Sequence, residues 1–209
     1  TQDFRDRWLY GVEARGAYEL RNGLALLATT FYNREEFSNA SPLVSTANTV
    51  GALLGAQFSV PEVLDLEFSA GYFKRSYAAH RGRLTGFTMR GALTWQPTRL
   101  MSVRAELLRQ DEATQVLNAL GKVRTTVSLG VDHTYRRGIS LYARGKVFLD
   151  DYDLIDRSDT SYAAEAGMNV LLNRRMVLSL SYAYGSRNSE IFDESFRRHV
   201  AAISVLRRF

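Results

Sequence analysis

Apolar and polar residues alternate along most of this chain, in short stretches that end at turn-forming residues. In the first stretch Trp8, Tyr10 and Val12 share one parity, whereas Glu13 and Arg15 have the other. Successive side chains of a β-strand point to opposite faces, so a period of two predicts strands with one apolar face. The predicted strands span residues 7–20, 24–32, 50–60, 64–72, 87–96, 101–107, 124–136, 139–147, 161–172, 176–184 and 199–209.

The connections between these stretches alternate in length. The short ones lie at residues 21–23, 61–63, 97–99, 137–138 and 173–175. The long, polar ones lie at residues 33–49, 75–84, 110–122, 150–159 and 186–196. Short turns at one rim and long loops at the other are typical of an all-β, antiparallel transmembrane barrel, with periplasmic turns and extracellular loops. Residues 104–122 are also rich in helix formers, so a helical turn within that connection is an alternative.

The aromatic residues of the apolar parity gather near the two ends of the predicted strands, with aliphatic residues between them. A bilayer selects this arrangement, because amphipathic rings favour the two membrane–water interfaces. A soluble barrel or sandwich also alternates, but its largest aromatic residues would lie centrally in an inward-facing core. The predicted interface aromatics are Trp8, Tyr10, Tyr18, Tyr72, Phe87, Trp95, Tyr135, Tyr162, Tyr182 and Tyr184. We therefore expect contact with the lipid bilayer and with lipopolysaccharide, and location in the bacterial outer membrane.

Composition narrows the function classes. The chain has no cysteine, which excludes disulfide frameworks and thiolate metal sites. No apolar run of helix-spanning length occurs. The net charge of +5 is spread along the chain without a basic block, so we expect no nucleic-acid partner.

The histidines do not indicate an active site. His133 and His199 have the apolar parity, and His80 lies in a polar loop without a sequence-local acid or serine. The acidic segment 150–159 lacks the glycine and terminal glutamate of a calcium loop. We predict no catalytic residue, no cofactor and no metal.

Charged residues of both signs occupy the opposite parity, which would face the lumen of a barrel. The predicted lumen-facing residues are Glu13, Arg15, Glu67, Arg90, Arg104, Glu106, Arg124, Arg144, Lys146 and Glu165. In a wide barrel these groups hydrate a pore, and the two signs could segregate across the wall to give ion selectivity. In a narrower barrel they pair across strands and plug the lumen. The pattern leaves both alternatives open.

The end of the chain carries a further signal. Phe209 closes the last predicted strand, and a terminal aromatic resembles the signal that the barrel-assembly machinery reads. We expect one barrel domain over residues 1–209. About 11–12 strands are visible, whereas a closed single-chain bacterial barrel has an even number. The chain is therefore expected to be the C-terminal part of a larger barrel, unless a strand is miscounted.

Short motifs from residue 95 onward recur in a fixed order. They are Trp95-Gln96-Pro97-Thr98, Gly130-Val131-Asp132-His133, Asp151-Tyr152, Arg157-x-Asp159, Leu172-Asn173-Arg174, Tyr182-x-Tyr184, Arg187-x-Ser189 and the final Phe209. In order and spacing they resemble the β-barrel porin-2 family of outer-membrane proteins. Arg207 and the Arg198-His199 pair depart from the family pattern. Some family members resemble proteins encoded beside exopolysaccharide secretion genes, so the resemblance implies an envelope role that includes polysaccharide export.

These observations together predict a non-enzymatic outer-membrane barrel that acts as a porin-like channel or in exopolysaccharide export. One alternative is a structural barrel with a plugged lumen that binds another envelope component. The other is a soluble ligand-binding β-barrel. Predicted partners are lipid, lipopolysaccharide and the barrel-assembly machinery, together with polysaccharide or envelope proteins.

Overall fold

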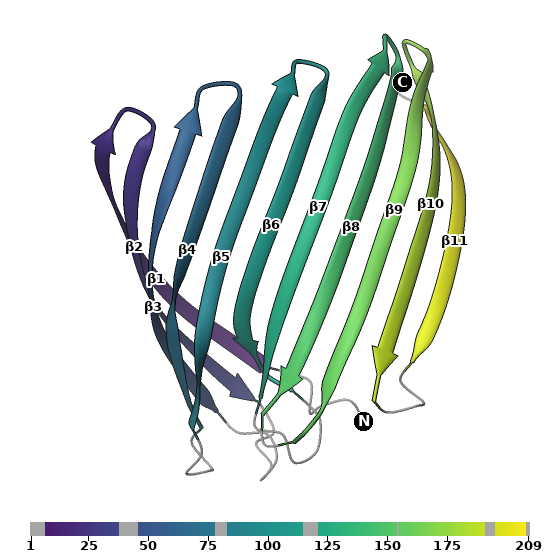
Figure 1. The fold of residues 1–209 in the computed structure, drawn as a ribbon. Coiled ribbons are helices and arrows are strands. Elements are labelled where there is room, and N and C mark those ends of the chain that lie inside the picture. The colour runs from purple at the N-terminus through teal and green to yellow at the C-terminus, as the bar shows by residue number, and fades with distance from the viewer. Residues whose placement is uncertain are drawn as a thin grey trace.

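The protein is described by a computed structural model that covers residues 7–37, 46–77, 83–114, 121–153, 155–190 and 195–207. Its strands form one sheet in sequence order, each antiparallel to the next, and the sheet is strongly curved (Figure 1). Within the described residues, the first and last strands form the two edges of the sheet. The strands are β1 (Arg7–Arg21), β2 (Leu24–Phe37), β3 (Ala47–Val60), β4 (Leu64–Tyr77), β5 (Arg83–Thr98), β6 (Met101–Glu112), β7 (Lys122–Arg136), β8 (Ile139–Tyr152), β9 (Ser158–Asn173), β10 (Met176–Ser189) and β11 (Phe196–Arg207).

The eleven predicted strands are confirmed, but most of them are longer than predicted at the loop end. Strand β2 continues to Phe37 and β6 to Glu112, so polar residues assigned to long loops belong to strands. The alternative of a helical turn is wrong for residues 104–112, which are β-strand. The backbone groups of these polar residues are paired with the neighbouring strands, and many of their side chains form ion pairs. The strands therefore continue although these segments contain few apolar residues.

The short turns lie together at one rim, which we call the turn rim, and the opposite end is the loop rim (Figure 1). Gly23 and Gly138 have φ of 78° and 84°, as tight hairpin turns require of their central residues. Glu62, in the β3–β4 turn, also has a positive φ of 61°, which L-residues with a Cβ rarely adopt. Phe209 lies outside the described residues, so its role as an assembly signal stays a prediction.

The two faces of the sheet differ in what they contact. Glu13 on β1 bonds Arg90 on β5 with Oε2 and Nη1 2.7 Å apart. Neighbouring strands are separated by about 4.8 Å, so β1 and β5 lie about 19 Å apart along the sheet. The two side chains can meet only across the concave face. Residues of the Glu13 and Arg90 parity therefore face the concave side, and the apolar parity faces the convex side.

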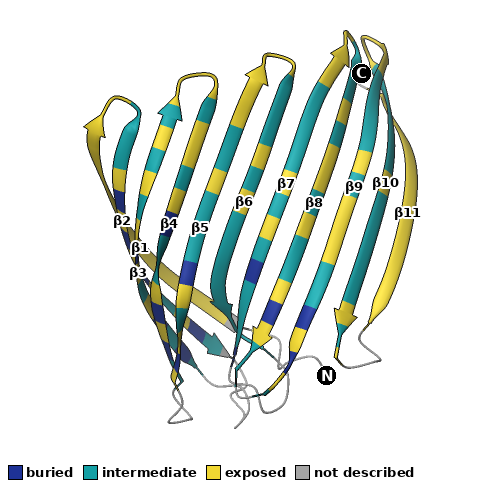
Figure 2. Ribbon diagram, in the orientation of Figure 1, coloured by how far each residue is buried: buried dark blue, intermediate teal, exposed yellow. Residues whose placement is uncertain are grey.

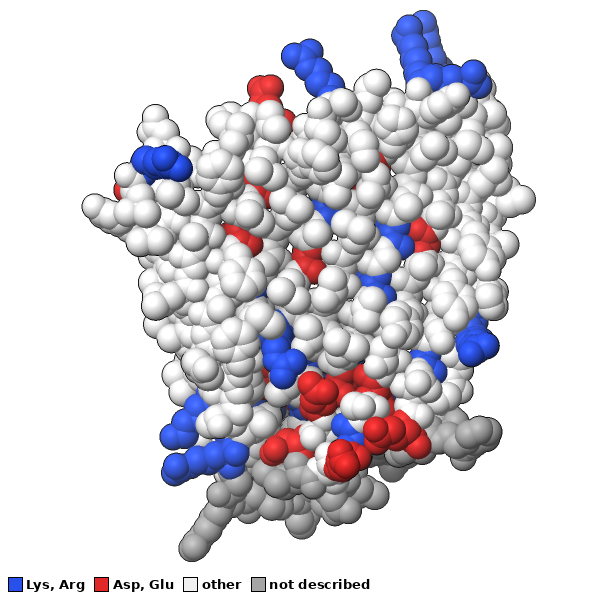
Figure 3. Space-filling model, in the orientation of Figure 1, with Lys and Arg blue, Asp and Glu red and all other residues white. Residues whose placement is uncertain are grey.

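The convex face is mostly apolar between the two rims (Figure 3), and most of its residues are intermediate or exposed (Figure 2). The predicted interface aromatics lie on this face. Nine of them, all except Tyr184, are 38–72% exposed. Tyr72 and Phe87 pack edge to face, with ring centroids 5.6 Å apart.

Toward the loop rim the convex face becomes polar immediately beyond the aromatics. Tyr32 is followed on its face by Arg34 and Glu36, which form an ion pair 2.6 Å long. Tyr72 is followed by Lys74, and Phe87 is preceded by Thr85 and Arg83, on the same convex face. This change marks the end of the apolar band. A transmembrane band is about 25 Å tall, and strands of this length extend several residues beyond it.

The buried core is small and lies on the concave face near the loop rim. Phe31, Leu53, Phe73 and Leu84 from β2–β5 form it, and Tyr77 and Val123 pack against it. Among the described residues no helix is long and apolar enough to cross a membrane.

Candidate functional site: a charged constriction at the loop rim

The β6–β7 hairpin bends inward at its loop end. The pairing of β6 with β5 ends at Met89↔Arg109, whereas the pairing of β6 with β7 continues to Glu112↔Lys122. Beyond Arg109, β6 therefore separates from β5 and moves over the concave face. Val123 of β7 packs against the apolar cluster of β2–β5, so the back of the hairpin lies on the inner face of those strands.

Arg75 of β4 connects the hairpin to the wall. Its Nη2 donates to Glu35 Oε2 at 2.6 Å, and its Nη1 donates to Asp111 Oδ2 at 2.9 Å. Thr49 Oγ1 donates to the same Asp111 oxygen at 2.8 Å. The side chains of Arg75, Glu35 and Asp111 are 5%, 7% and 8% exposed. These residues come from four strands, β2, β3, β4 and β6, and form one buried cluster. We call Glu35, Thr49, Arg75 and Asp111 the latch.

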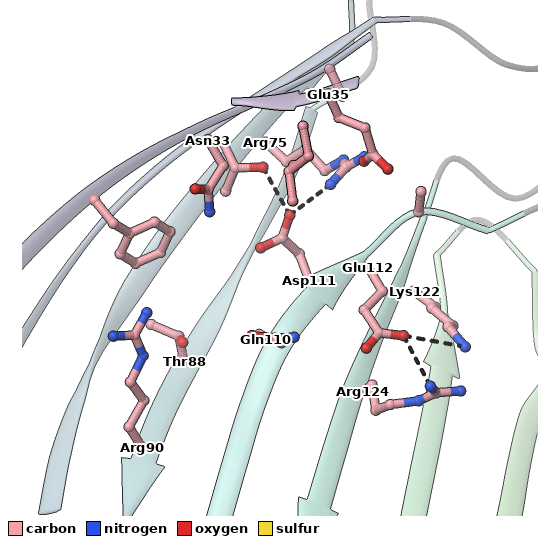
Figure 4. A pocket seen from close by; sticks show the side chains of 15 residues that line it. Asn33, Glu35, Arg75, Thr88, Arg90, Gln110, Asp111, Glu112, Lys122 and Arg124 are labelled. Atoms are coloured by element: carbon pink, nitrogen blue, oxygen red, sulfur yellow. Dashed lines mark hydrogen bonds and ion pairs between the residues drawn. The ribbon is translucent and has the colours of Figure 1, made fainter. Parts of the chain in front are cut away.

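A second charged cluster lies beside the latch, on β6, β7 and β8 (Figure 4). Arg124 donates two hydrogen bonds to Asp150, from Nε to Oδ1 at 2.6 Å and from Nη2 to Oδ2 at 2.7 Å. Lys122 Nζ donates to Asp150 Oδ2 at 2.9 Å. Glu112 contacts Lys122 and Arg124, at 3.6 and 3.2 Å. Fork-shaped arginine–carboxylate pairs hold a fixed geometry, so this cluster orders the strands around the hairpin.

A third cluster continues the charged rim on β9 and β10. Asp159, whose side chain is 1% exposed, accepts hydrogen bonds from Arg157 and Arg187, each 2.8 Å long. Ser189 Oγ and Tyr152 Oη also donate to Asp159, at 2.6 and 3.1 Å. Asp150 and Asp159 are cross-strand neighbours. Each is neutralised by its own cations, so the two carboxylates can lie side by side.

A cavity of about 470 Å³ lies between the latch and the second cluster. Figure 4 shows Arg75 and Asp111 on one side of it, Glu112, Lys122 and Arg124 on another, and Arg90 deeper in the concave space. Amide and hydroxyl groups from Asn33, Thr88 and Gln110 complete its polar lining. The hairpin and its charged clusters can narrow a lumen while the polar side chains of the cavity stay available for hydrogen bonds with a solute.

The predicted lumen-facing residues all have the concave parity, and most of them are paired. Arg15 binds Glu67 at 2.9 Å, Arg104 binds Asp132 at 2.7 Å, and Arg144 lies 3.9 Å from the same Asp132. Other partners are hydroxyl groups: Tyr142 donates to Glu165 and Ser128 to Glu106. Lys146 makes no ion pair with a described residue. In the described ion pairs, opposite charges lie side by side on the concave face, so these pairs do not form separate regions of one sign.

The sequence prediction missed the latch. Glu35, Arg75 and Asp111 lay in segments assigned to long loops, and Asp111 has the parity that faces outward elsewhere on β6. Glu35 and Arg75 do continue the concave parity of β2 and β4, so extending those strands would have found them. The inward bend of β6 leaves no trace in the alternation.

The histidines that were considered as catalytic residues do not lie at this constriction. His133 and His199 have the convex parity, and His199 Nδ1 is 2.7 Å from Tyr182 Oη. His80 lies outside the described residues. Among the described residues, no three His, Asp or Glu side chains are placed to hold a metal ion.

Comparisons with known proteins agree with this geometry. The family model described as "Putative beta-barrel porin 2" matches residues 1–209. Curated proteins give no match. Porin-family barrels are a class that is generally not enzymatic.

Three solved structures share the fold. The FrpB iron transporter from Neisseria meningitidis (F3-3 variant) has a TM-score of 0.70 at 8% identity, covering 97% of this chain and 40% of the transporter. The copper transporter OprC has a TM-score of 0.61 at 9% identity, covering 97% and 41%. The alcaligin outer-membrane receptor FauA from Bordetella pertussis has 0.53 at 12%, covering 95% and 42%. The chain thus spans about two fifths of the length of these structures, and at such identities the likeness shows the fold alone. By its family match and its architecture, the chain belongs to the family described as Putative beta-barrel porin 2 and is a porin-like outer-membrane β-barrel protein.

Proposed function

We propose that the chain forms part of the wall of a water-filled outer-membrane channel, and that the β6–β7 hairpin narrows the extracellular mouth of this channel. The observation that carries this proposal is the polar cavity of about 470 Å³ between the hairpin clusters on the concave face. Below the hairpin, the concave face carries Arg15, Glu67, Arg104 and Asp132 with side chains 27–57% exposed. Charged groups that remain solvated along the inner face support a hydrated lumen.

The pairing of lumen charges supports passage of small hydrophilic solutes with weak charge preference. A pore selects ions by rings or rows of one sign. Here each exposed arginine of the middle region lies within 4 Å of a carboxylate, as Arg104 and Arg144 do with Asp132. The field in the lumen is then that of dipoles and falls off quickly with distance.

A plugged barrel that binds another envelope component is the second candidate. The bonds from Glu13 to Arg90 and from Arg15 to Glu67 cross the concave space between non-adjacent strands, which favours it. A link to exopolysaccharide export, and binding of lipopolysaccharide or the assembly machinery, stay predictions from the sequence. The expectation of further strands also stays a prediction.

The test is the reversal potential of the full-length protein in planar bilayers under a salt gradient. We expect conductance with a small reversal potential. Replacing Arg104→Gln and Arg144→Gln leaves Asp132 uncompensated, so the reversal potential should shift toward cation selectivity. The control is Lys74→Gln, which removes a charge from the convex face and should change nothing. A folded protein without conductance would reject the channel and favour the plugged barrel.

A further inference from the structure

The turn rim carries a set of arginines that the channel proposal does not use. Four of the five short turns contain or adjoin them: Arg21, Arg99, Arg136, Arg137, Arg174 and Arg175. All six are exposed. Within the part of the chain that the structure describes, none of them forms an ion pair. Glu62 is the acidic residue of the turns at this rim.

The two rims therefore differ in how far their basic residues are paired with carboxylates. At the loop rim, carboxylates neutralise the cations of the three charged clusters, as Asp150 does for Lys122 and Arg124, although Lys74, Arg83, Arg197 and Arg198 form no ion pair with a described residue. At the turn rim, six arginines without an ion pair to a described residue share the turns with one acidic residue, Glu62. In Figure 3, mostly Lys and Arg side chains stand out from the top of the molecule above a largely white band, whereas Asp and Glu gather with Lys and Arg at the bottom. Unpaired like charges repel one another, so this arrangement calls for an anionic partner.

The depth of the turns limits which partner can reach these groups. Tyr135 precedes Arg136 directly, and Trp95 and Tyr18 lie four and three residues before Arg99 and Arg21. A tilted strand advances about 2.5 Å per residue along the membrane normal, so the arginines lie within about 10 Å of the aromatic belt. Aromatic belts mark the headgroup level of a bilayer. Because the turns are so short, the guanidinium groups cannot extend far beyond the headgroup layer.

We infer that the turn rim binds the phosphate groups of anionic phospholipids in the periplasmic leaflet. Guanidinium groups present several donors in a planar fork that matches phosphate oxygens, and arginine is suited to this contact more than lysine. All the basic residues of these turns are arginine. Binding of anionic lipid here would fix the barrel's depth and tilt at the periplasmic side.

The two tryptophans of the chain make a position-specific test possible. Trp95 lies near the turn rim and Trp8 near the loop rim, both on the convex face. In full-length protein with Trp8→Phe, and in the counterpart with Trp95→Phe, each remaining tryptophan reports the lipid beside one rim. Any tryptophan elsewhere in the polypeptide is replaced in both. The protein is reconstituted into phosphatidylcholine vesicles that contain phosphatidylglycerol brominated near the headgroup, and quenching is measured against mole fraction.

Trp95 should be quenched as if phosphatidylglycerol were enriched about fivefold over the bulk, the effect of roughly one well-placed basic residue near an anionic surface. Trp8 should show markedly less enrichment. Changing Arg99, Arg137, Arg174 and Arg175 to glutamine should return the quenching of Trp95 to the bulk value, and high salt should weaken it in the parent. The matched control changes Lys74, Arg83, Arg197 and Arg198 at the loop rim to glutamine and should leave Trp95 unaffected.

Two outcomes would overturn the inference. Quenching of Trp95 that follows the bulk mole fraction in the parent would show that no anionic lipid gathers at the turn rim. An equal loss in the turn-rim and loop-rim variants would show a general effect of protein charge without a site. Brominated phosphatidylcholine serves as the lipid control, since it should quench the parent and the turn-rim variant alike if both are inserted to the same depth.

Discussion

Replacing Arg75 with leucine should detach the β6–β7 hairpin from the inner face of β3 and β4. Arg75 holds Glu35 and Asp111 by bonds of 2.6 and 2.9 Å. The Asp111 carboxylate is 8% exposed, so without the guanidinium its charge would stay buried with only the Thr49 hydroxyl as a partner. Breaking a buried ion pair from one side costs about 3–5 kcal/mol. The hairpin can relieve part of that cost by moving into the lumen and exposing Asp111 to water.

The change should appear in two measurements on the lipid-refolded protein. In hydrogen exchange, amides of Asp111, Glu112, Lys122 and Val123 should lose protection while the turn-rim ends of β6 and β7 keep theirs. The midpoint of urea unfolding should fall. Single-channel current should also become noisier, because the constriction is no longer fixed.

Arg90→Leu is the matched control, because it removes the same side chain from an exposed pair. Arg90 and Glu13 are 38% and 43% exposed, and such pairs contribute about 0–1 kcal/mol. A triple variant with Arg75→Leu, Glu35→Gln and Asp111→Asn should recover much of the lost stability, since no buried charge is left unpaired. Equal effects of Arg75→Leu and Arg90→Leu on exchange and unfolding would refute the latch.

Three further expectations follow from the faces and turns. Leu66→Arg, Leu141→Arg and Leu180→Arg on the convex face should each cost about 2–4 kcal/mol in urea titrations in lipid if the position is near the bilayer midplane, with Ser140→Arg on the concave face much milder. A cysteine at Asp156 should react with a membrane-impermeant maleimide on intact cells, whereas one at Asn22 should react only after the outer membrane is permeabilised; the reverse pattern would invert the topology. Glu62→Gly should raise stability by roughly 0.5–1 kcal/mol, because glycine adopts the positive φ at this turn without steric cost; a loss of stability would contradict that origin of strain.

The strands and their facing were predictable because a two-sided sheet imposes a period of two on the sequence. Trp8, Tyr10 and Val12 alternate with Glu13 and Arg15, and the structure places the two sets on opposite faces. Turn positions were equally clear, since Asn22-Gly23 and Arg137-Gly138 supply the positive φ that hairpins need.

The ends of the strands at the loop rim were not predictable in the same way. Alternation depends on contact with lipid, and it fades where the strands leave the apolar band, as at Arg34 and Glu36. Partners that decide the structure there are distant in sequence: Arg75 meets Asp111 thirty-six residues later. Ser69 shows the same limit on the concave face, because it is 4% exposed although it reads as a solvated lumen residue. Packing against a neighbouring strand cannot be seen in a single strand's pattern.

The position of the constriction gives the most direct test of the central claim, that a hydrated lumen is narrowed at its extracellular end by the latched hairpin. The measurement is single-channel conductance of the full-length protein with a graded series of polyethylene glycols added to one side at a time. Polymers of intermediate size should lower the conductance when added at the turn rim, because they enter the lumen there, and have little effect at the loop rim. In the Arg75→Leu variant the two sides should become more alike. Equal exclusion at both sides of the parent protein, or entry from the loop rim alone, would contradict the account.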